Sequence, residues 1–596
     1  MNDAYRILSA QTGVPPELVR RVASGATWST TVAGPTEPPG LSPDLMIITV
    51  EDVRLVSGFT GSWGLEFEPA TVAFDEPIVW EVTSGRSSNG ALPWLAVETE
   101  TGAVVLSVHW SGNWRFVITP GVDGLQIVVG LHPDGQRAIL ADGEALRLPE
   151  VSVAVGATDA DAAAAMAALL AGQVPPSAAP LLTEWNHWWP YEDAEIDEAT
   201  FLAEATEAAG LGLEVAVLDA GWFGRAEASS DWVAERGDWH RVNTARFPHG
   251  LAWLADETRG RGIDFGIWIE AEAIGPGATV AAERPEVVAR ASTRSLGYVC
   301  LGSPAGRDHV HDHVARLIQE TGARWIKWDF NLDPGSGCQR DDHGHASTDG
   351  LLRHYLGLYE VLDRLRSEHP QTIFEACSSG GLRIDPGLAA HVDGFFLSDP
   401  DWTEHHLTCL WGAARLLPPR QLLHWPQSEW RGEHRFQKVD YSGTLITAAQ
   451  FDTKIRAAML HRFGVSVRLT ELRADLRERL RHHLRVYETS IRPLLVDGIL
   501  RPLTDQPLRE ERGHRQPAYQ LISGDDHVIA AFLLPPGWHW HPVHPTGLDP
   551  TADYEVRDLD TGDRLDVAAG ATLMTEGLAT PTAPATSAWW SIRRSR

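Results

Sequence analysis

The strongest constraint on the fold is a rhythm that begins near residue 181 and continues to residue 427. Short apolar runs alternate there with polar loops and with amphipathic helical stretches such as 197–210 and 351–369. The strand candidates are 181–189, 213–222, 264–272, 296–303, 323–331, 372–380, 392–399 and 421–427. Strands that alternate with helices predict a parallel sheet, and no phosphate-binding glycine fingerprint follows the first strand. We therefore predict a (β/α)₈ TIM barrel rather than an open doubly wound sheet.

The chain on either side of this region has the period-two alternation of antiparallel sheets. Apolar and polar residues alternate in several runs between 45 and 131, and again between 519 and 560, with Gly, Pro and Asp between the runs. A short Ala-rich helical stretch precedes a PPSAAP linker. We predict an α/β and β multidomain protein, because the chain is too long for one core. Its parts are an N-terminal β-sandwich with a linker helix (1–175), the catalytic barrel (176–485) and a C-terminal antiparallel β-sandwich domain (486–596).

Composition excludes several classes of partner. The 596 residues carry a formal net charge of −30, which repels phosphate backbones and anionic lipids, so neither nucleic acid nor a membrane is expected as a partner. No apolar run approaches the roughly eighteen residues of a membrane span. The four cysteines lack a metal or disulfide spacing, and the start MNDAYRILSA has no signal-peptide pattern. We expect a cytoplasmic protein.

Polar residues at strand ends are the candidate site residues, because the active site of a (β/α)₈ barrel forms where strands end and loops begin. They are Asn186, Trp188, Asp219, Trp222, Trp268, Glu270, Lys327, Asp329, Asn331, Cys377, Ser378, Ser379 and Asp399. The chain also contains 24 tryptophans, whose aromatic faces suit the C–H-rich faces of sugars. Asp329 and Asp399 are the best pair of carboxylates for glycoside hydrolysis, which needs two.

One candidate strand, ending in WIKWDFN, sets a lysine beside a carboxylate. Lys327 is one of only three lysines in a chain with 50 basic residues. Residues two apart point to the same side of a strand, so we expect Lys327 to hold Asp329 ionised and to bind sugar hydroxyls. Each aspartate also has a plainer interpretation. Asp329 can be a strand-end salt bridge with Lys327, and Asp399, which precedes Pro400, can be a helix N-cap.

A series of motifs along the chain resembles one known family. The motifs are TSGRSS (83–88), HWSGNW (109–114), EWNHWW (184–189), VLDAGWFG (217–224), GDW (237–239), IKWDFN (326–331), CSSGGLRID (377–385) and SDPD (398–401). In this order they resemble the α-galactosidases of glycoside hydrolase family 36. The resemblance spans about 50–530 and implies a β-sandwich, a catalytic barrel and a C-terminal β domain. It also implies hydrolysis of terminal α-galactosides with retention, no cofactor, a small oligosaccharide or glycoside as substrate, and a homodimer or homotetramer.

Carried over position by position, the resemblance makes Asp329 the nucleophile and Asp399 the general acid/base. It also implies a set of substrate-binding residues around them. These are Lys327 (towards the 3- and 4-hydroxyls), Asp219 (the 4- or 6-hydroxyl), Trp188 and Trp268 (pocket walls), Asn331 and Cys377 (towards the 2-position), Trp222 and Arg294 (a match to a family arginine).

The sequence departs from the family pattern at a sugar-reading position. Family members usually carry two adjacent aspartates in the second-strand motif, whereas Ala220 follows Asp219 here. Loss of a group that reads a hydroxyl relaxes or redirects recognition of the 4- and 6-positions. Alternatives therefore stay open: an α-N-acetylgalactosaminidase, another α-glycosidase, a transglycosylase, or, from a different class, an inactive sugar-binding protein. HWPQSEW at 424–430 also departs from the usual loop and would shape a different leaving-group site.

Histidines and a cysteine were weighed as other kinds of site and set aside. His309 and His313 lie four apart on one predicted helix, which is a metal-ligand spacing, and DDHGH at 341–345 adds further candidate ligands. The two stretches together match no known metal motif, so a solvated helix face is preferred and no metal site is predicted. Cys377 is interpreted as a pocket-lining thiol, because no motif places a histidine beside it.

Overall fold

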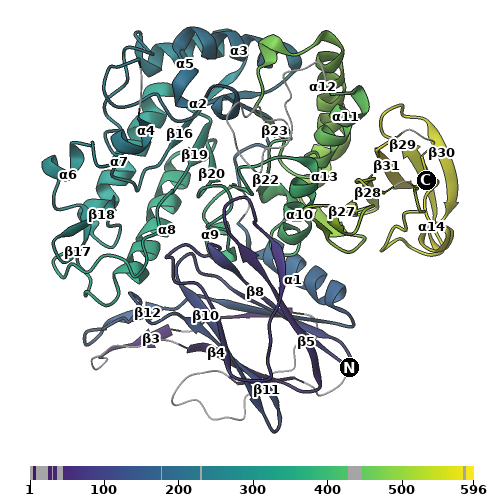
Figure 1. Cartoon of the computed structure of the whole chain (residues 1–596), viewed down its shortest axis with the longest axis horizontal. Helices are drawn as coiled ribbons and strands as arrows, with labels where there is room; N and C mark the ends of the chain where they lie inside the picture. The colour runs from purple at the N-terminus through teal and green to yellow at the C-terminus, as the bar shows by residue number, and fades with distance from the viewer. Residues whose placement is uncertain are drawn as a thin grey trace.

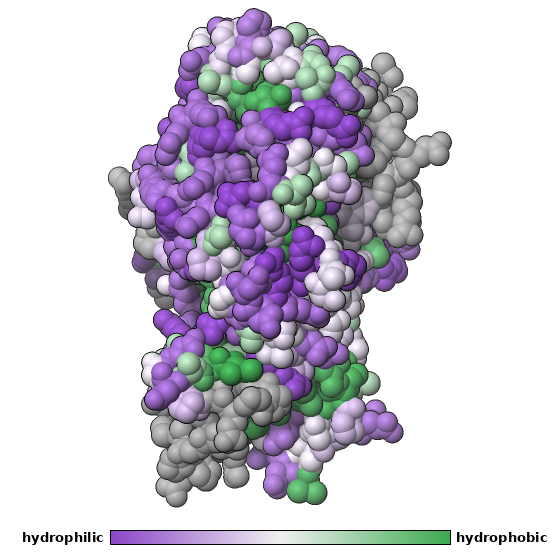
Figure 2. Space-filling view, turned by 90° about the vertical axis from the view of Figure 1, so that its left-hand side faces the viewer, coloured by the Kyte–Doolittle hydropathy of each residue, from purple (hydrophilic) through white to green (hydrophobic). Residues whose placement is uncertain are grey.

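The computed structural model describes residues 5–8, 25–29, 31–35, 44–175, 177–228, 231–426, 446–537, 539–581 and 585–595. The N-terminal sheets lie at the bottom of Figure 1, the barrel and its helices lie above them, and a C-terminal sheet lies to the side. Hydrophilic residues cover most of the face in Figure 2, and hydrophobic ones form scattered patches. None of the described helices has both the length and the apolar character needed to cross a membrane.

Two antiparallel sheets form the N-terminal part, as predicted, in the orders β1-β4-β11-β10-β7 and β2-β13-β9-β8-β5-β6; β3 pairs with β12. The strands are β1 (Tyr5–Leu8), β2 (Gly25–Trp28), β3 (Thr31–Ala33), β4 (Asp44–Val50), β5 (Val53–Gly61), β6 (Glu68–Thr71), β7 (Ile78–Glu81), β8 (Gly90–Thr99), β9 (Ala103–Val108), β10 (Trp114–Gly121), β11 (Gly124–Leu131), β12 (Ala145–Arg147) and β13 (Val151–Gly156). In β10 every second side chain from Trp114 to Ile118 is buried. The predicted alternation thus gives the sheet one core face.

Helix α1 (Asp159–Gln173) covers the second of these sheets, where it packs on β9 and β13. Small buried side chains such as Ala162 and Ala163 bring the helix close to the strands, which accounts for its Ala-rich sequence. The helix begins after Thr158, whose side chain accepts a hydrogen bond from the backbone N–H of Asp161. Because of this cover, β9 is buried along its whole length.

The central part is a barrel built on an eight-stranded parallel sheet, as predicted. Its strands are β14 (Glu184–Asn186), β15 (Val215–Leu218), β16 (Asp264–Ile269), β19 (Trp325–Trp328), β20 (Ile373–Ala376), β21 (Gly394–Phe396), β22 (Leu422–Leu423) and β23 (Gly464–Val465). A parallel bridge between Leu423 and Arg462 brings the two edges of the sheet together. Every residue of β15, β19 and β20 is buried, and strands buried on both faces read as nearly continuous apolar runs.

One predicted barrel strand was assigned wrongly. The run 296–303 contains most of β18 (Arg294–Val299), which pairs antiparallel with β17 (Val288–Ala291) in a hairpin outside the barrel. The strand that completes the barrel is instead β23, which has two residues. A short apolar run has no periodicity that separates a barrel strand from a hairpin strand. Two residues, in turn, are too few to form any pattern.

Helices connect the barrel strands and surround them (Figure 1). They are α2 (Trp188–Glu195), α3 (Glu198–Leu211), α4 (Trp232–Glu235), α5 (Gly250–Gly260), α6 (Val280–Glu283), α7 (Pro304–Thr321), α8 (Gly350–Glu368), α9 (Pro386–Ala389), α10 (Thr403–Ala413), α11 (Ala448–Ala457), α12 (Ala474–Val486) and α13 (Arg492–Leu495), with the short η1 (Pro419–Gln421), η2 (Leu469–Glu471) and η3 (Tyr487–Ile491). The connection from β19 to α8, residues 329–349, contains neither a helix nor a strand.

The C-terminal part is one six-stranded antiparallel sheet in the order β24-β27-β28-β31-β29-β30, and β25 and β26 form a separate pair. Its elements are β24 (Ile499–Pro502), β25 (Pro507–Leu508), β26 (Arg512–Gly513), β27 (Ala518–Ser523), β28 (Asp526–Phe532), β29 (Asp553–Asp558), β30 (Arg564–Ala569), α14 (Gly570–Glu576) and β31 (Ser587–Arg594). The predicted domain boundary at 485 falls inside α12, and the helical run continues to Leu495.

Candidate active site

A pocket at the carboxyl ends of the barrel strands collects most of the predicted site residues. It is lined by Trp188, Asp219, Ala220, Trp232, Trp268, Lys327, Asp329, Asn331, Cys377 and Asp399. The cavity between these side chains is compact, with a volume of about 80 Å³. Of the residues predicted to act in catalysis or to bind the substrate, all except Trp222 and Arg294 belong to this lining. The strand-end candidates Asn186, Glu270, Ser378 and Ser379 lie outside it.

Trp222 and Arg294 lie outside the lining for different reasons. Trp222 is buried behind it, where its Nε1 donates a 2.9 Å hydrogen bond to the backbone oxygen of Trp268. Arg294 begins β18, and its side chain is exposed on the hairpin. Arg294 was expected in the pocket only because it matches a family arginine, and no feature of its own segment indicated that position. Trp222 therefore supports a pocket wall, and Arg294 has no position in the pocket.

Asp329 follows the last residue of β19 and is the best-satisfied carboxylate of the pocket. Its Oδ2 accepts hydrogen bonds from Asn331 Nδ2 at 2.8 Å and from Trp268 Nε1 at 3.2 Å. Its Oδ1 accepts from the backbone N–H groups of Phe330 at 2.8 Å and Ser379 at 3.3 Å. Four donors that converge on two oxygens hold the carboxylate in one orientation, and they match the acceptor-only character of an ionised aspartate.

Lys327 pairs with Asp219 rather than with Asp329, contrary to the expectation from strand alternation. Its Nζ lies 2.9 Å from Asp219 Oδ2, and both side chains are buried. The ammonium also lies over the rings of Trp425 and Phe396, at 4.3 and 4.8 Å from the ring centres. Burial, the largest single effect, opposes the charge, but Asp219 and the other acidic groups nearby together outweigh it and hold the pKa of Lys327 well above its usual value. Alternation correctly put Lys327 inside the barrel, but the nearest carboxylate there comes from β15.

Asp219 itself is held by groups from a neighbouring strand. Asn186 Nδ2, at the end of β14, donates to Asp219 Oδ2 at 2.9 Å. The backbone N–H of Asp219 donates to His187 Nδ1 at 2.8 Å. Asp219, Asn186 and Lys327 thus form a buried polar group at the floor of the pocket, and its donors are ordered before a ligand binds.

Glu270 and Arg236 lie behind Asn331 and Asp329. Arg236 Nη1 donates to both oxygens of Glu270, at 2.8 and 3.1 Å. Glu270 Oε1 accepts the backbone N–H of Asn331 at 2.6 Å, which positions the amide that binds Asp329. Burial raises the pKa of Glu270 to about 7 despite this pairing. The sequence indicated Glu270 as a strand-end carboxylate, but it contained no signal for Arg236.

Asp399 lies beyond β21 and has a different environment from Asp329. Its Oδ2 accepts a 2.6 Å hydrogen bond from Trp63 Nε1. Burial raises the pKa of Asp399 to about 6, and the nearby charge of Asp329 adds to the shift. Helix α10 begins at Thr403 after Trp402, so Asp399 is not the helix cap that its Pro400 neighbour indicated. The carboxyl group is therefore free to act in the pocket.

Trp63 belongs to the N-terminal sandwich and was missed by the sequence analysis. The segment between β5 and β6 also provides Glu66, whose Oε2 accepts a 2.7 Å hydrogen bond from Ser398, the residue before Asp399. A contact across 336 sequence positions has no local signature. Trp232, in α4, was also missed, because it does not lie at the end of a strand. It lines the pocket and packs edge-on against Trp268.

Cys377 and Ala220 complete the lining with small side chains. Burial raises the pKa of the Cys377 thiol well above its usual value, which agrees with a neutral wall residue rather than a nucleophile. Ala220 lines the pocket beside Asp219, where a second acidic side chain was expected from the family pattern. Of the departing stretch 424–430, the part from 427 onward lies outside the described residues.

Comparisons with known proteins agree with this architecture. A family model described as Melibiase matches residues 176–498. Among curated proteins, a probable α-galactosidase C of Aspergillus flavus is 26% identical over 563 residues, which cover 89% of this chain and 70% of that protein. The α-galactosidase AgaA of Geobacillus stearothermophilus is 26% identical over 552 residues, which cover 87% of this chain and 71% of that protein.

Solved structures share the fold at lower sequence identity. A variant of the Geobacillus stearothermophilus AgaA, a GH36 α-galactosidase in complex with raffinose, has a TM-score of 0.79 at 22% identity and covers 92% of this chain and 76% of its own. The galactosidase domain of the α-galactosidase–sucrose kinase AgaSK has a TM-score of 0.79 at 21% identity and covers 96% of this chain and 78% of its own.

Proposed function

The chain belongs to the melibiase family, and on this premise we propose that it is a retaining exo-α-galactosidase that uses Asp329 and Asp399. The main support is the contrast between two carboxyl groups that line one pocket. Asp329 accepts four hydrogen bonds from nitrogen donors, whereas Asp399 is held by the Trp63 indole and has its pKa raised to about 6 by burial. A carboxylate fixed by nitrogen donors suits the nucleophile, and a carboxyl group with a raised pKa suits the acid.

In the first step Asp329 attacks the anomeric carbon of the terminal sugar. The bond from that carbon to the glycosidic oxygen breaks, and the oxygen takes the proton of Asp399 as the aglycone leaves. Asn331 and Trp268 hold the attacking carboxylate in place. The product of this step is a glycosyl ester on Asp329 and an ionised Asp399.

In the second step a water molecule attacks the same carbon from the side that the aglycone left. Asp399 takes the proton of the water, the ester bond to Asp329 breaks, and the sugar leaves with its original anomeric configuration. Both aspartates return to their starting protonation states, so the cycle needs no further proton donor or acceptor.

The floor and walls of the pocket are suited to a single sugar ring. Asp219 and Lys327 offer an acceptor and a donor, held 2.9 Å apart, to adjacent hydroxyls. Trp188 and Trp268 supply aromatic faces, and Asn331 and Cys377 line the same pocket as Asp329; we assign these two to the 2-position of the sugar. Galactose as that sugar is supported by the α-galactosidase relatives and by neighbours whose structures hold raffinose and stachyose.

The nucleophile is tested by Asp329→Ala with a nitrophenyl α-galactoside. Turnover should be lost, and azide should restore part of it by entering the vacated space and giving the β-galactosyl azide, because it attacks from the side where Asp329 stood. Asp333→Ala is the matched control: it removes a nearby exposed carboxylate of the same segment and should keep most of the activity. Wild-type activity in Asp329→Ala would contradict the assignment.

Substrate class is tested with a panel of nitrophenyl glycosides, with and without a sugar acceptor. A preference for the α-galactoside over the α-N-acetylgalactosaminide and the α-glucoside, with hydrolysis dominant over transfer, supports the proposal. Binding of galactose without turnover of any glycoside would instead indicate an inactive sugar-binding protein.

We also propose a reducing, cytoplasmic setting and a homo-oligomeric state. The four cysteines are free and buried, which suits a compartment where thiols stay reduced. Measurement of the mass in solution tests the oligomer: a dimer or tetramer is expected, and a monomer at micromolar concentration would contradict it.

A further inference from the structure

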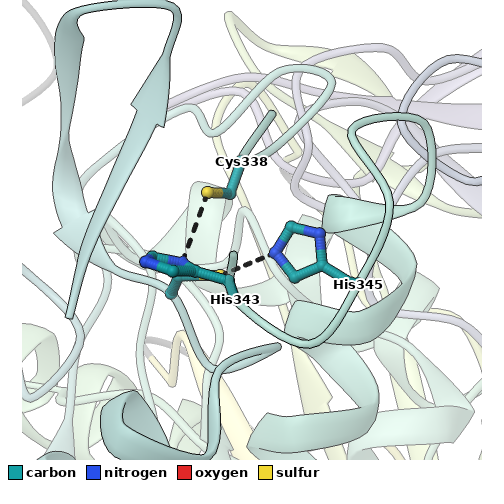
Figure 3. A group of neighbouring side chains, drawn as sticks. Cys338, His343 and His345 are labelled. Carbon is teal, nitrogen blue, oxygen red and sulfur yellow. Dashed lines mark hydrogen bonds between the residues drawn. The ribbon is translucent and has the colours of Figure 1, made fainter. Parts of the chain in front are cut away.

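Four cysteine and histidine side chains outside the pocket form a cluster of possible metal ligands, and we propose that they bind a structural zinc ion. They are Cys300, Cys338, His343 and His345, whose ligand atoms all lie within 4.8 Å of one another. All four are buried, with exposed fractions of 0%, 0%, 2% and 7%. Figure 3 shows Cys338, His343 and His345 turned towards one another.

The distances within this cluster are close to those around a tetrahedral metal ion. Cys300 Sγ lies 3.2 Å from His345 Nε2, and Cys338 Sγ lies 3.7 Å from His343 Nδ1. Zinc bonds of about 2.3 Å to sulfur and about 2.0–2.1 Å to nitrogen place the ligand atoms about 3.3–3.8 Å apart. Two thiolates and two imidazoles are the donor set of many structural zinc sites, and they disfavour calcium and magnesium, which prefer oxygen.

The groups around the ligands orient them as metal ligands are oriented. His345 Nδ1 lies 2.8 Å from the backbone oxygen of Ala346. A carbonyl oxygen only accepts, so Nδ1 carries the hydrogen and the lone pair of Nε2 points to Cys300. The backbone N–H of Arg290 points to Cys338 Sγ at 3.5 Å. A second ring nitrogen bound to a carbonyl and an N–H directed at a sulfur are characteristic of the surroundings of zinc ligands.

His343 is buried with few polar contacts. Its Nδ1 faces the sulfur of Cys338, and among the described residues its buried Nε2 has no hydrogen-bond partner. A buried imidazole that gains a single long contact to sulfur does not recover the cost of leaving water. A bond from Nδ1 to zinc does recover it.

Contacts within the protein hold the loop that carries the ligands in place before a metal binds. Arg340, between two of the ligands, pairs with Asp342 at 2.6 Å and donates to the backbone oxygen of Pro285 at 2.8 Å. Gly302 packs so closely that a Cβ at this position would lie 2.7 Å from Cδ2 of His345. These contacts hold the loop in the shape that brings its ligands together, which lowers the ordering cost of binding.

Four protein ligands leave no open position for a substrate, so the site is structural rather than catalytic. Cys300 lies between the β17–β18 hairpin and α7, whereas the other ligands belong to the segment 329–349. Long connections without secondary structure are uncommon in compact proteins. The zinc ion links the segment 329–349 to the hairpin. The same segment begins with Asp329 and Asn331. Binding therefore stabilises the part of the chain that carries the proposed nucleophile.

Zinc binding here exchanges protons for metal. The two thiols lose their protons as the Zn–S bonds form, so up to two protons leave for each Zn²⁺ bound, and nothing is oxidised or reduced. The site therefore fills near neutral pH and empties in acid, where the thiolates and the imidazoles compete with protons for the metal.

The direct test measures zinc in the full-length protein, purified without a histidine tag or chelator. Elemental analysis should find about one zinc ion per chain, and Cys338→Ser and His345→Gln should lower it to about a tenth or less, because three ligands bind structural zinc weakly. The control is His313→Gln. His313 lies beside His309 on α7, and no group of three or more candidate ligands among the described residues contains either, so this variant should keep its zinc.

A second measurement keeps the proposal testable if the variants fail to fold. Wild-type protein, unfolded with chelator and refolded with Co²⁺, should show the visible absorption of a tetrahedral cobalt–thiolate site. Removal of metal from the native protein should lower its midpoint of thermal unfolding and expose Cys300 and Cys338 to alkylation. Absence of both zinc and the cobalt spectrum would overturn the proposal, as would a Cys300–Cys338 disulfide found by peptide mapping of freshly purified protein.

Discussion

The indole Nε1 of Trp63, in the N-terminal sandwich, donates a 2.6 Å hydrogen bond to Oδ2 of Asp399 at the end of a barrel strand. The proposed general acid is therefore tuned by a different domain from the one that carries it. An N–H that points at a carboxylate favours its ionised form, so Trp63 opposes the burial that raises the pKa of Asp399. The N-terminal sandwich is thus a part of the site and not only a support for the barrel.

Replacement of Trp63 by Phe should shift the pH dependence of the enzyme. Loss of the donor removes a stabilisation of ionised Asp399, so its pKa should rise above about 6. The alkaline limb of kcat/KM should then move up by about one pH unit, since a hydrogen bond to a charged group contributes roughly 1.5–3 kcal/mol and water replaces part of it. Trp80→Phe, on β7 of the same domain, is the control and should leave the limb in place. A downward shift in Trp63→Phe would contradict the role.

The wild-type profile itself should have its alkaline limb near pH 6. Asp399 must be protonated to donate, and its pKa is raised to about 6, so kcat/KM should fall as pH rises through that value. Asp399→Asn should lose this limb, and its rate on an alkyl galactoside should fall by about 10²–10⁴-fold. A dinitrophenyl galactoside needs no acid for its leaving group and should still give a burst of phenolate. An unchanged limb in the variant would assign the acid to another group.

The buried pair of Lys327 and Asp219 should be costly to break. Lys327→Met leaves a buried carboxylate without its cation, so the free energy of unfolding should fall by about 3–5 kcal/mol. The double variant with Asp219→Asn should lose less than the sum of the single changes, which a double-mutant cycle in urea measures. The control Arg294→Met, on the exposed hairpin, should change stability by about 0.5 kcal/mol or less. Additive single changes would show that the pair is not coupled.

Ala220 should influence how strongly the pocket discriminates between sugars that differ at the 6-position. Ala220→Asp adds an acceptor beside Asp219 in the pocket wall, so discrimination should rise by at least about 10-fold, because a group that binds a hydroxyl rejects analogues without it. The measured quantity is the kcat/KM ratio between the α-galactoside and the β-L-arabinopyranoside, a galactoside without its 6-hydroxymethyl group. Ala220→Val fills the same space without an acceptor and should not raise the ratio. Equal ratios in the wild type, Ala220→Asp and Ala220→Val would show that the 6-position of the sugar does not lie beside residue 220.

The predictions from the sequence that the structure confirms all depended on local pattern, although not every prediction of that kind was right. Period-two alternation predicts the N-terminal and C-terminal sheets, and apolar runs between helices predict the barrel. The active site of a barrel forms at the carboxyl ends of its strands, and this rule correctly predicted that Asp219, Lys327, Asp329 and Asp399 line one pocket. Short strands defeated the same reasoning, because β23 has only two residues and β18 reads like any buried strand.

Local pattern is enough to predict which side of a strand a residue faces, as it did for Lys327. The packing of the folded chain was needed to bring Lys327 to Asp219, and Trp63 to Asp399 across 336 positions. It also decided that Cys300 meets a ligand 45 positions away. Contacts of this kind depend on how whole segments pack, and a pattern with a period of a few residues carries no information about them.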